Sequence, residues 1–481
     1  MRFQPLSLYP GHILERISSS DWLVAGAVSV LFVFLRWATW SIGLPPLEWV
    51  FIGAIIAAYF AVKCFSKPQI VLGLIITGSL LGNLILFYEE GLVPFSLFQI
   101  FYILGVGLFF LRWAYLGFVS IRKTGFELEL ALFFSLVFLS ILWTPDAERA
   151  FIHAIRVLVL SGLLFLFVNW IDKPRHITWL FISMVAAGSL LGIIALYETI
   201  NNPMAILQDF LTDGHRLASR ARIGQEDPNF FASLFFLPLA FTVSVSLSNI
   251  SLRTRIISGL LFIILFSAVL VTFSRSAWVA VIIMLIVLGV LYRQYKLFLY
   301  SALAAVIVIL VIPELRFLFV NIINRFIGLF SGGVDTSNYL RLVLLDASFR
   351  IFFDSWLVGV GWRGFPDALL TYYSLQDTMG VYEPHNVIYM VYTELGLVGL
   401  LLFVFVVLKI FRLAWANTRY NAGIEIKILS HALFGAFLAY AVFYQFLGSG
   451  FVDNQLWITT GLIISLNFYL KNQSIHHKNK V

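Results

Sequence analysis

Residues 256–292 read IISGLLFIILFSAVLVTFSRSAWVAVIIMLIVLGVLY, an apolar run interrupted by a single arginine, Arg275. A helix needs about 17 to 25 residues to cross a hydrocarbon core roughly 30 Å thick, so this run is too long for one span. We predict two helical spans joined by a tight outward turn at residues 274–276. The alternative is an arginine that snorkels at a helix end, but so short a turn holds the guanidinium near the membrane surface, where it calls for an anionic partner.

The whole chain has the composition of an integral membrane protein. Its 481 residues are 60% hydrophobic and 12% charged, whereas soluble domains are roughly 25% charged. Apolar segments of spanning length recur about 14 times, without the alternation of membrane strands. We therefore predict an all-α, polytopic membrane helix bundle of about 12–14 transmembrane helices, with a large outer loop that carries short interfacial helices. The first 20 residues lack the features of a signal peptide, and the single cysteine, Cys64, excludes an internal disulfide and a cysteine metal cluster.

Basic residues gather in alternate connections, which the positive-inside rule places in the cytoplasm together with both termini. The remaining connections then face outward, and two of them are long. We divide the chain into N-terminal transmembrane helices, central transmembrane helices with an outer loop at 200–230, a large outer loop, and C-terminal helices with a cytoplasmic tail, at residues 1–125, 126–312, 313–385 and 386–481.

The predicted outer face carries arginine but no lysine. Arginine binds phosphate or carboxylate through its planar fork and stays charged when partly desolvated, as a site for an anionic substrate requires. The alternative is ion pairing within the loops, with Asp227, Asp335, Asp354 and Asp367 as partners. The outer arginines are Arg149, Arg216, Arg220, Arg222, Arg275, Arg316, Arg325, Arg341, Arg350 and Arg363.

Two segments of the predicted outer face have the sequence patterns of helices. In the first, Asp227 caps a helix whose first turn holds Pro228, and three arginines precede a helix start that attracts anions. In the second, from Arg341 onward, apolar residues recur at helical spacing and predict a helix lying along the interface; they are Leu344, Leu345, Phe349, Phe352 and Phe353. Gly359, Gly361 and Gly364 spell GxGxxG, but no βαβ unit surrounds them, so we interpret them as a turn.

Residues 382–396, YEPHNVIYMVYTELG, begin a further span. We predict His385 in the first helical turn, where the helix dipole favours the neutral imidazole that a general base needs. Tyr389, Tyr392 and Gly396 share its face. Glu394 lies about 13 Å deeper on the opposite side, so we expect it to lock the bundle rather than to pair with His385.

Together these motifs resemble the O-antigen ligase and O-antigen polymerase superfamily of bacterial membrane glycosyltransferases. The resemblance spans residues 130–410 and rests on the order of its motifs. They are SILWTPDAERA, RIGQEDPNFFA, SRSAW with Arg275, Arg341 followed by DSWLVGVGWRGF, and PHNVIYMVYTELGLVGL. Ser355 departs from the family, which commonly has proline there.

The resemblance implies a metal-independent, inverting glycosyl transfer at the outer face of the bacterial inner membrane, without a cofactor. It implies an undecaprenyl-diphosphate-linked glycan donor, a glycan or lipid A-core acceptor and a possible chain-length regulator. The catalytic residues would be His385, Arg341 and Arg275, with the arginines stabilising the departing diphosphate. The substrate-binding residues would be Arg216, Arg220, Arg222, Asn229, Arg350, Arg363, Asn386 and Tyr389.

Two further alternatives stay open. The enzyme either joins repeat units, as a polymerase, or attaches the chain to an acceptor, as a ligase; the number of spans and the arginine-rich loop slightly favour the polymerase. The competing class is a transporter of lipid-linked oligosaccharide or of a small anion. Transporters place ionisable residues and broken helices near the membrane midplane, often in repeated halves, whereas the polar residues here collect in the predicted outer loops.

Overall fold

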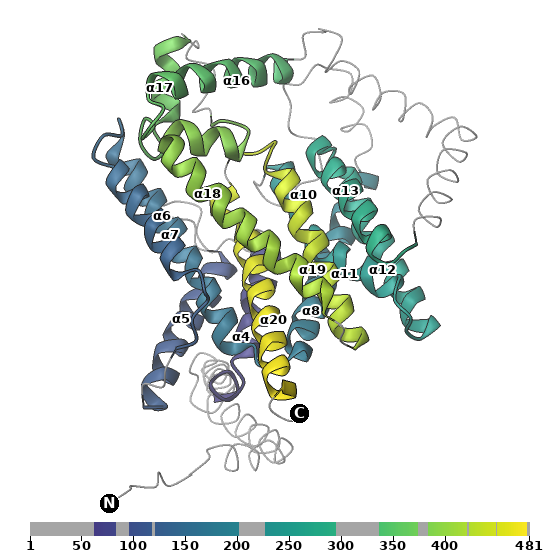
Figure 1. Cartoon of the computed structure of the whole chain (residues 1–481). Coiled ribbons are helices and arrows are strands. Elements are labelled where there is room, and N and C mark those ends of the chain that lie inside the picture. Colours follow the sequence, from purple (N-terminus) through teal and green to yellow (C-terminus); the bar gives the residue numbers. More distant parts are fainter. Residues whose placement is uncertain are drawn as a thin grey trace, which may run out of the picture. The chain divides into compact units, whose positions relative to one another are not determined.

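The residues that the computed structural model describes are mostly helical (Figure 1). The structure describes residues 62–82, 96–117, 121–201, 227–294, 336–373, 383–420, 423–448 and 450–478. Within these ranges no strand is present, and seven helices are long and apolar enough to cross a membrane. The predicted all-α polytopic bundle is therefore confirmed. Three of the apolar segments that we predict to span the membrane, residues 22–40, 47–62 and 297–313, lie wholly or almost wholly outside the described residues.

The chain divides into two compact units, residues 1–74 with 103–119 and residues 75–102 with 120–481. Helices α4 (Gln69–Leu81) and α5 (Leu97–Tyr115) each contribute to both. In the first unit, Arg112 donates a hydrogen bond to the carbonyl oxygen of Phe65. The ring of Phe65 meets that of Tyr115 edge to face, with centroids 5.3 Å apart.

The second unit contains the other helices and all the candidate site residues that the structure describes. Its helices are α6 (Glu127–Ser140), α7 (Ala147–Trp170), α8 (Pro174–Asn201), α10 (Pro228–Ser233), α11 (Phe236–Ser246), α12 (Leu252–Val271), α13 (Arg275–Leu291), α16 (Thr336–Asp354), α17 (Phe365–Tyr372), α18 (Val387–Arg419), α19 (Ile424–Phe443), the 3-10 turn η3 (Gly450–Val452) and α20 (Asn454–Lys478).

Helix α19 forms the centre of this unit, packed against α11 and α13, while α20 packs against α7. Small residues permit the close approach that membrane helices use. At Gly435 of α19, a side chain would press on Leu288 of α13, and at Gly461 of α20 it would press on Phe167 of α7. These contacts fix the positions of the helices around the candidate site relative to one another.

The long apolar run is divided into two helices as predicted, but the turn lies at residues 272–274, two residues before the predicted turn at 274–276. Helix α12 ends at Val271 and α13 begins at Arg275. Phe273 makes the turn by adopting a positive φ of 52°, and the Ser274 hydroxyl caps α13 by accepting a hydrogen bond from the backbone N–H of Ala277. The turn thus places Arg275 at the first position of a helix.

Residues 336–354 form a helix, α16, as predicted, and only part of its predicted apolar stripe packs against other helices. It buries Leu344, Ala347 and Ile351 against Phe365 and Leu369. Phe349 and Phe353 of the predicted stripe are instead exposed, at 47% and 72%. The difference arises because α16 packs on α17 and α18 from one side, which the helical period of one segment cannot reveal.

Helix α18 is broken at Gly396, where the backbone has φ 63° and ψ −163°. Residues 356–361 fill the break. The backbone N–H of Val360 donates to the carbonyl of Thr393, and that of Leu397 donates to the carbonyl of Trp356, at 2.9 and 2.8 Å. A side chain at Gly396 would collide with the Leu357 carbonyl. The GxGxxG segment is therefore a loop, as predicted, and it docks on a broken membrane helix.

Candidate active site

The first part of the site joins two segments that lie far apart in the sequence. The carboxylate of Asp227 caps α10 by accepting from the backbone N–H of Asn229 at 2.7 Å, as predicted for this helix start. The Asn229 side-chain oxygen in turn accepts a hydrogen bond from Ser274 Oγ at 2.7 Å. Since Ser274 directly precedes Arg275, the α10 start is fastened to the turn that carries the arginine.

The second part is the segment before α18, and it corrects one prediction. The helix begins at Val387, so His385 precedes it and is not in its first turn. Asn386 takes the capping position because its side-chain oxygen accepts from the backbone N–H groups of Ile388 and Tyr389. A short polar side chain competes for backbone donors at a helix start, which explains the shift of two residues.

The turn after α19 holds this segment in place. The Asn386 side-chain nitrogen donates to the carbonyl of Gln445 at 2.9 Å, and the backbone N–H of Val387 donates to the carbonyl of Tyr444 at 2.9 Å. Tyr444 is itself anchored, since its hydroxyl donates to the buried carboxylate of Asp453. His385 therefore precedes a fixed helix start.

Charged residues of two other segments influence the pKa of His385. Partial burial by the surrounding protein lowers the pKa of His385, and the positive charge of Arg341 lowers it further. The negative charges of Asp227 and Glu383 oppose this shift. Because the net shift is downward and the residue stays accessible to solvent, His385 is neutral near pH 7. Arg341 on α16 and Asp227 at α10 thus act on the same imidazole.

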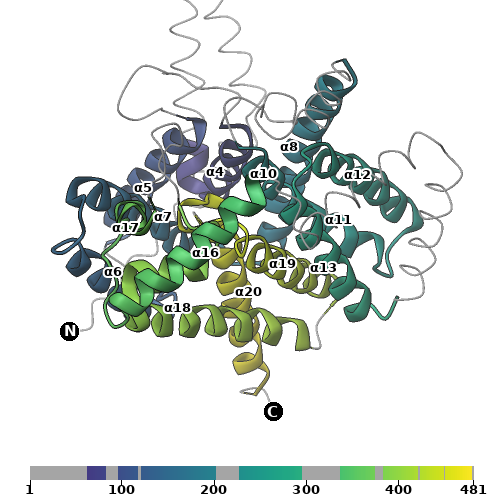
Figure 2. The same cartoon turned by 90° about the horizontal axis from the view of Figure 1, so that it is seen from above.

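The helix arrangement agrees with this convergence. In both views α16 runs from α17 toward α10, and its N-terminal end lies on the α10 side (Figures 1 and 2). Arg341 belongs to that half of α16. The C-terminal half packs on α18, where Phe352 meets Tyr392 with ring centroids 5.1 Å apart.

Three of the arginines assigned to the outer face form ion pairs, and only the pair of Arg149 uses a partner that the simpler interpretation named, Asp367. Arg149 pairs with Asp367, and the exposed Arg350 pairs with Asp346 at 2.6 Å. Arg363 is 9% exposed and pairs with Glu383 at 2.7 Å. Burial opposes the charge of Arg363, but the hydrogen bond and charge of Glu383 raise its pKa on balance. These arginines have structural roles, and a contact with substrate stays a prediction for Arg350 and Arg363.

Glu394 acts as the expected structural lock. Its side chain is 1% exposed and accepts a hydrogen bond from the backbone N–H of Arg363 at 2.9 Å. Arg363 adopts a positive φ of 60°, which is rare for a residue with a side chain. One buried carboxylate and one buried arginine therefore tie the 355–364 loop to α18 and hold Glu383 near His385.

The remaining predicted residues divide into two groups. Tyr389 contacts Tyr392 along α18, with ring centroids 5.7 Å apart. Arg216, Arg220 and Arg222 lie outside the described residues, so their contribution stays a prediction. Within the described part of the chain, no three His, Cys, Asp or Glu side chains are grouped as a metal site would require.

Sequence reasoning missed two residues that shape the site. Ser274 bonds to Asn229, and the SRS motif, in which serine directly precedes a helix-starting arginine, was the available signal. Glu383 binds Arg363 across the loop. Its partner lies 20 residues earlier, and no pattern in the sequence connects the two.

Residues 260–404 match the model of a family described as O-antigen ligase. No curated protein matches the chain at a significant level. The matched range begins in α12 and ends in α18, so it includes the α12–α13 turn, α16, the 355–364 loop and His385.

Proposed function

Starting from the O-antigen ligase and polymerase superfamily, which the match over residues 260–404 supports, we propose that this multi-pass membrane enzyme transfers an undecaprenyl-diphosphate-linked glycan. The acceptor would be another glycan or a lipid A-core, and the site would face the periplasm or cell exterior. The observation that carries the proposal is that Arg341 and Asp227, from two separate outer segments, act electrostatically on His385, while Asn229 fastens the Arg275 turn to the Asp227 helix.

His385 is the proposed general base. An acceptor hydroxyl must lose a proton as its oxygen attacks the anomeric carbon, and a neutral imidazole near pH 7 can receive that proton. Partial burial and Arg341 both favour the neutral form. The acceptor oxygen forms the new glycosidic bond, the bond from the anomeric carbon to the phosphate oxygen breaks, and the configuration at that carbon is inverted.

Arg275 and Arg341 are proposed to stabilise the leaving diphosphate. Negative charge develops on its bridging oxygen as the bond breaks, and preorganised cations lower the barrier by meeting that charge. Arg275 lies at the start of α13, where the helix dipole also favours an anion. In this proposal, the charges of Arg275 and Arg341 and the start of α13 stabilise the leaving diphosphate without a metal ion.

Purified protein in lipid nanodiscs, supplied with a lipid-diphosphate glycan donor and an acceptor, tests the assignment. Arg275→Ala and Arg341→Ala should each lower kcat about 10²- to 10³-fold, the loss seen when one oxyanion donor is removed. Arg253→Ala is the matched control because Arg253 is exposed in the first turn of α12, at its opposite end. Undiminished transfer in both site variants would contradict the proposal.

Deletion of the gene separates the two modes of transfer. Loss of chain elongation would identify a polymerase, whereas accumulation of unattached lipid-linked polymer would identify a ligase. A requirement for a chain-length regulator can be tested in the same strain by deleting the regulator alone.

A further inference from the structure

Helix α7 carries an arginine inside a segment that is long and apolar enough to cross the membrane. Arg156 follows Ala147, the first residue of α7, by nine positions, which places it roughly 14 Å along the helix axis at 1.5 Å per residue. The whole helix of 24 residues is about 36 Å long, and the hydrocarbon core is about 30 Å thick. Arg156 therefore lies within the apolar part of the membrane, where an ionisable side chain is costly and usually has a partner.

The surface around Arg156 is exposed and apolar. Arg156 is itself exposed, and its neighbours one turn away on the same helix, Ile152 and Val159, are 59% and 47% exposed. Exposed apolar side chains on a membrane span mark a surface that faces lipid. An anion that reaches this guanidinium therefore comes from the bilayer.

The arginines near Arg156 are matched by carboxylates, but Arg156 is not. Arg149, two turns earlier on α7, pairs with Asp367, and Arg363 pairs with Glu383. Arg156 forms no ion pair or hydrogen bond with any residue that the structure describes. One positive charge is therefore left over at this end of α7.

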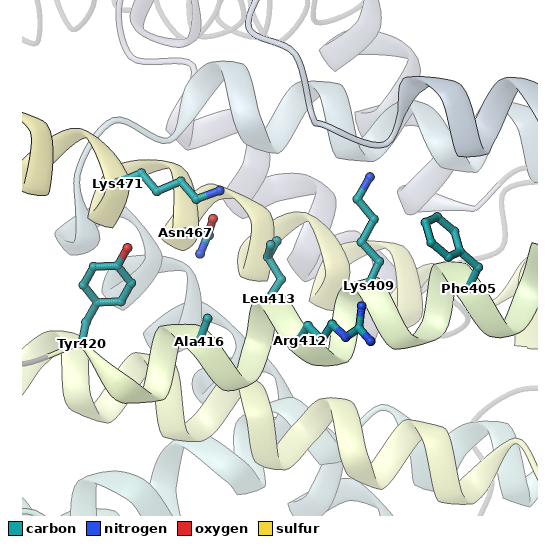
Figure 3. Close-up of a pocket in the computed structure, with 8 residues that line it drawn as sticks. All are labelled: Phe405, Lys409, Arg412, Leu413, Ala416, Tyr420, Asn467 and Lys471. Atoms are coloured by element: carbon teal, nitrogen blue, oxygen red, sulfur yellow. The ribbon is translucent and has the colours of Figure 1, made fainter.

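A cation on another span shows the usual arrangement. Lys409 of α18 lines a pocket of about 380 Å³ beside α20 (Figure 3). It pairs with Glu129 of α6 and donates a hydrogen bond to the carbonyl of Gly125, so its charge is matched within the protein. The charge of Arg156 instead calls for an anion that the described part of the chain does not supply.

His153 adds a second donor beside Arg156. It lies three positions earlier, on the same side of the helix, and the charge of Arg156 acts on its imidazole. The indole N–H of Trp362 donates to His153 Nδ1 at 3.1 Å, so this nitrogen carries no proton and the neutral ring has its proton on Nε2. The Nε2–H group and the guanidinium are thus two donors within one turn of α7.

We propose that Arg156 and His153 bind the phosphate of an anionic phospholipid from the surrounding bilayer. A phosphate accepts hydrogen bonds from the planar fork of an arginine, and its single negative charge balances the one unmatched cation. Ile152 and Val159 would contact the acyl chains, from which a free phosphate gains nothing. Through His153, the bound lipid would brace the 355–364 loop. This inference does not depend on the transfer reaction.

Native mass spectrometry of the purified full-length protein tests the charge match. Phosphatidylglycerol is compared with phosphatidylcholine, which also has two acyl chains and a phosphate but no net charge. Arg156→Gln should weaken binding of phosphatidylglycerol about fivefold, the contribution of one cation near an anionic headgroup, and binding of phosphatidylcholine less. Arg156→Lys keeps the charge but not the fork and should give an intermediate affinity. His153→Phe removes a donor to the phosphate that both lipids share, so it should weaken both about threefold.

Leu158→Gln is the matched control. Leu158 is 40% exposed on α7 and lies two positions after Arg156, about 200° away around the helix. This variant places the same amide on the same span but outside the site, so it should bind phosphatidylglycerol like the unchanged protein. Melting temperatures check that every variant is folded.

Two competitors identify the source of the phosphate. Inorganic phosphate lacks the chains, and the lipid-diphosphate glycan donor is assigned to Arg275 and Arg341, so neither should displace phosphatidylglycerol at equal concentration. Displacement by either competitor overturns the proposal. It is also overturned if a folded Arg156→Gln variant binds phosphatidylglycerol like the unchanged protein or loses both lipids equally, or if a folded His153→Phe variant loses neither.

Discussion

The two ends of α18 carry positive charge in different ways. Near its start, Arg363 pairs with Glu383 and also donates its backbone N–H to Glu394. Near its end, Lys409 pairs with Glu129 of α6 and donates a hydrogen bond to the carbonyl of Gly125. The start of α18 is therefore held by a network of buried charges, whereas its later half is tied to α6 through the pair of Lys409 with Glu129.

This difference indicates two different tasks. Buried ionic groups are retained at a cost in desolvation, and in return they hold chemical groups in fixed positions. The start of α18 uses them to position the segment around His385. The pair of Lys409 with Glu129 instead joins two packed helices, α18 and α6. Substitutions along α18 and in a control helix test this contrast.

The largest expected effect on stability is at the break in α18. Gly396→Ala would place a side chain on the Leu357 carbonyl at a backbone angle that favours glycine. We expect a loss of about 3 kcal/mol in the free energy of unfolding, from strain and overpacking. The measurement is thermal unfolding in detergent.

Gly259→Ala is the matched control for this substitution. Gly259 lies within α12, and nothing approaches the position of its missing side chain within 4 Å. The helix should tolerate alanine there or gain up to about 1 kcal/mol. Equal melting temperatures for the two alanine variants would show that the loop does not dock on the break.

Removal of the Glu394 carboxylate should have a smaller effect. Glu394→Ala leaves the buried N–H of Arg363 without its acceptor, which costs about 1–3 kcal/mol. Glu394→Gln keeps a carbonyl oxygen and should lose less. Glu198→Ala changes an exposed glutamate on α8 and should stay within about 0.5 kcal/mol. A Gln variant as unstable as the Ala variant would argue against the hydrogen bond as the cause.

The Asn386 cap at the start of α18 should contribute less than Glu394 to the free energy of unfolding. Asn386→Ala removes the acceptor for two backbone N–H groups, and such caps are worth about 1 kcal/mol. Asn386→Asp keeps that acceptor but loses the bond to Gln445. We expect the melting temperature to be highest for the unchanged protein, lower for Asn386→Asp and lowest for Asn386→Ala. An Asn386→Ala variant as stable as the unchanged protein would exclude the capping role.

The smallest expected effect is a shift in the pH dependence of the transfer rate. Since His385 must be neutral to accept a proton and its pKa is lowered, transfer should be constant above pH 7 and fall only on the acidic side. The negative charge of Asp227 raises this pKa in part, so Asp227→Asn should lower it and move the acidic limb to lower pH. A shift in the opposite direction, in a pH–rate profile, would contradict the assignment of the limb to His385.

The sequence was sufficient for the features that depend on local patterns. One arginine within 37 apolar residues predicted the α12–α13 turn, and Asp227 before Pro228 predicted the capped start of α10. The depth of Glu394 within a span predicted its structural role, because an isolated carboxylate there needs a partner.

The features that depend on distant contacts were not predictable. The break at Gly396 exists because residues 356–361 supply the missing hydrogen bonds, and a single glycine within a helical pattern does not reveal such a partner. The buried face of α16 likewise depends on α17 and α18. Helical periodicity showed that α16 is amphipathic, but its neighbours determine which apolar residues are buried.

The central claim is that Arg341 and His385 serve one reaction at one site. A double-mutant cycle with Arg341→Ala and His385→Ala, using the transfer rate at saturating donor, tests it most directly. Residues that act as a unit are strongly non-additive, so the double variant should be hardly slower than the slower single variant. Additive losses, or unchanged transfer in either single variant, would contradict the claim.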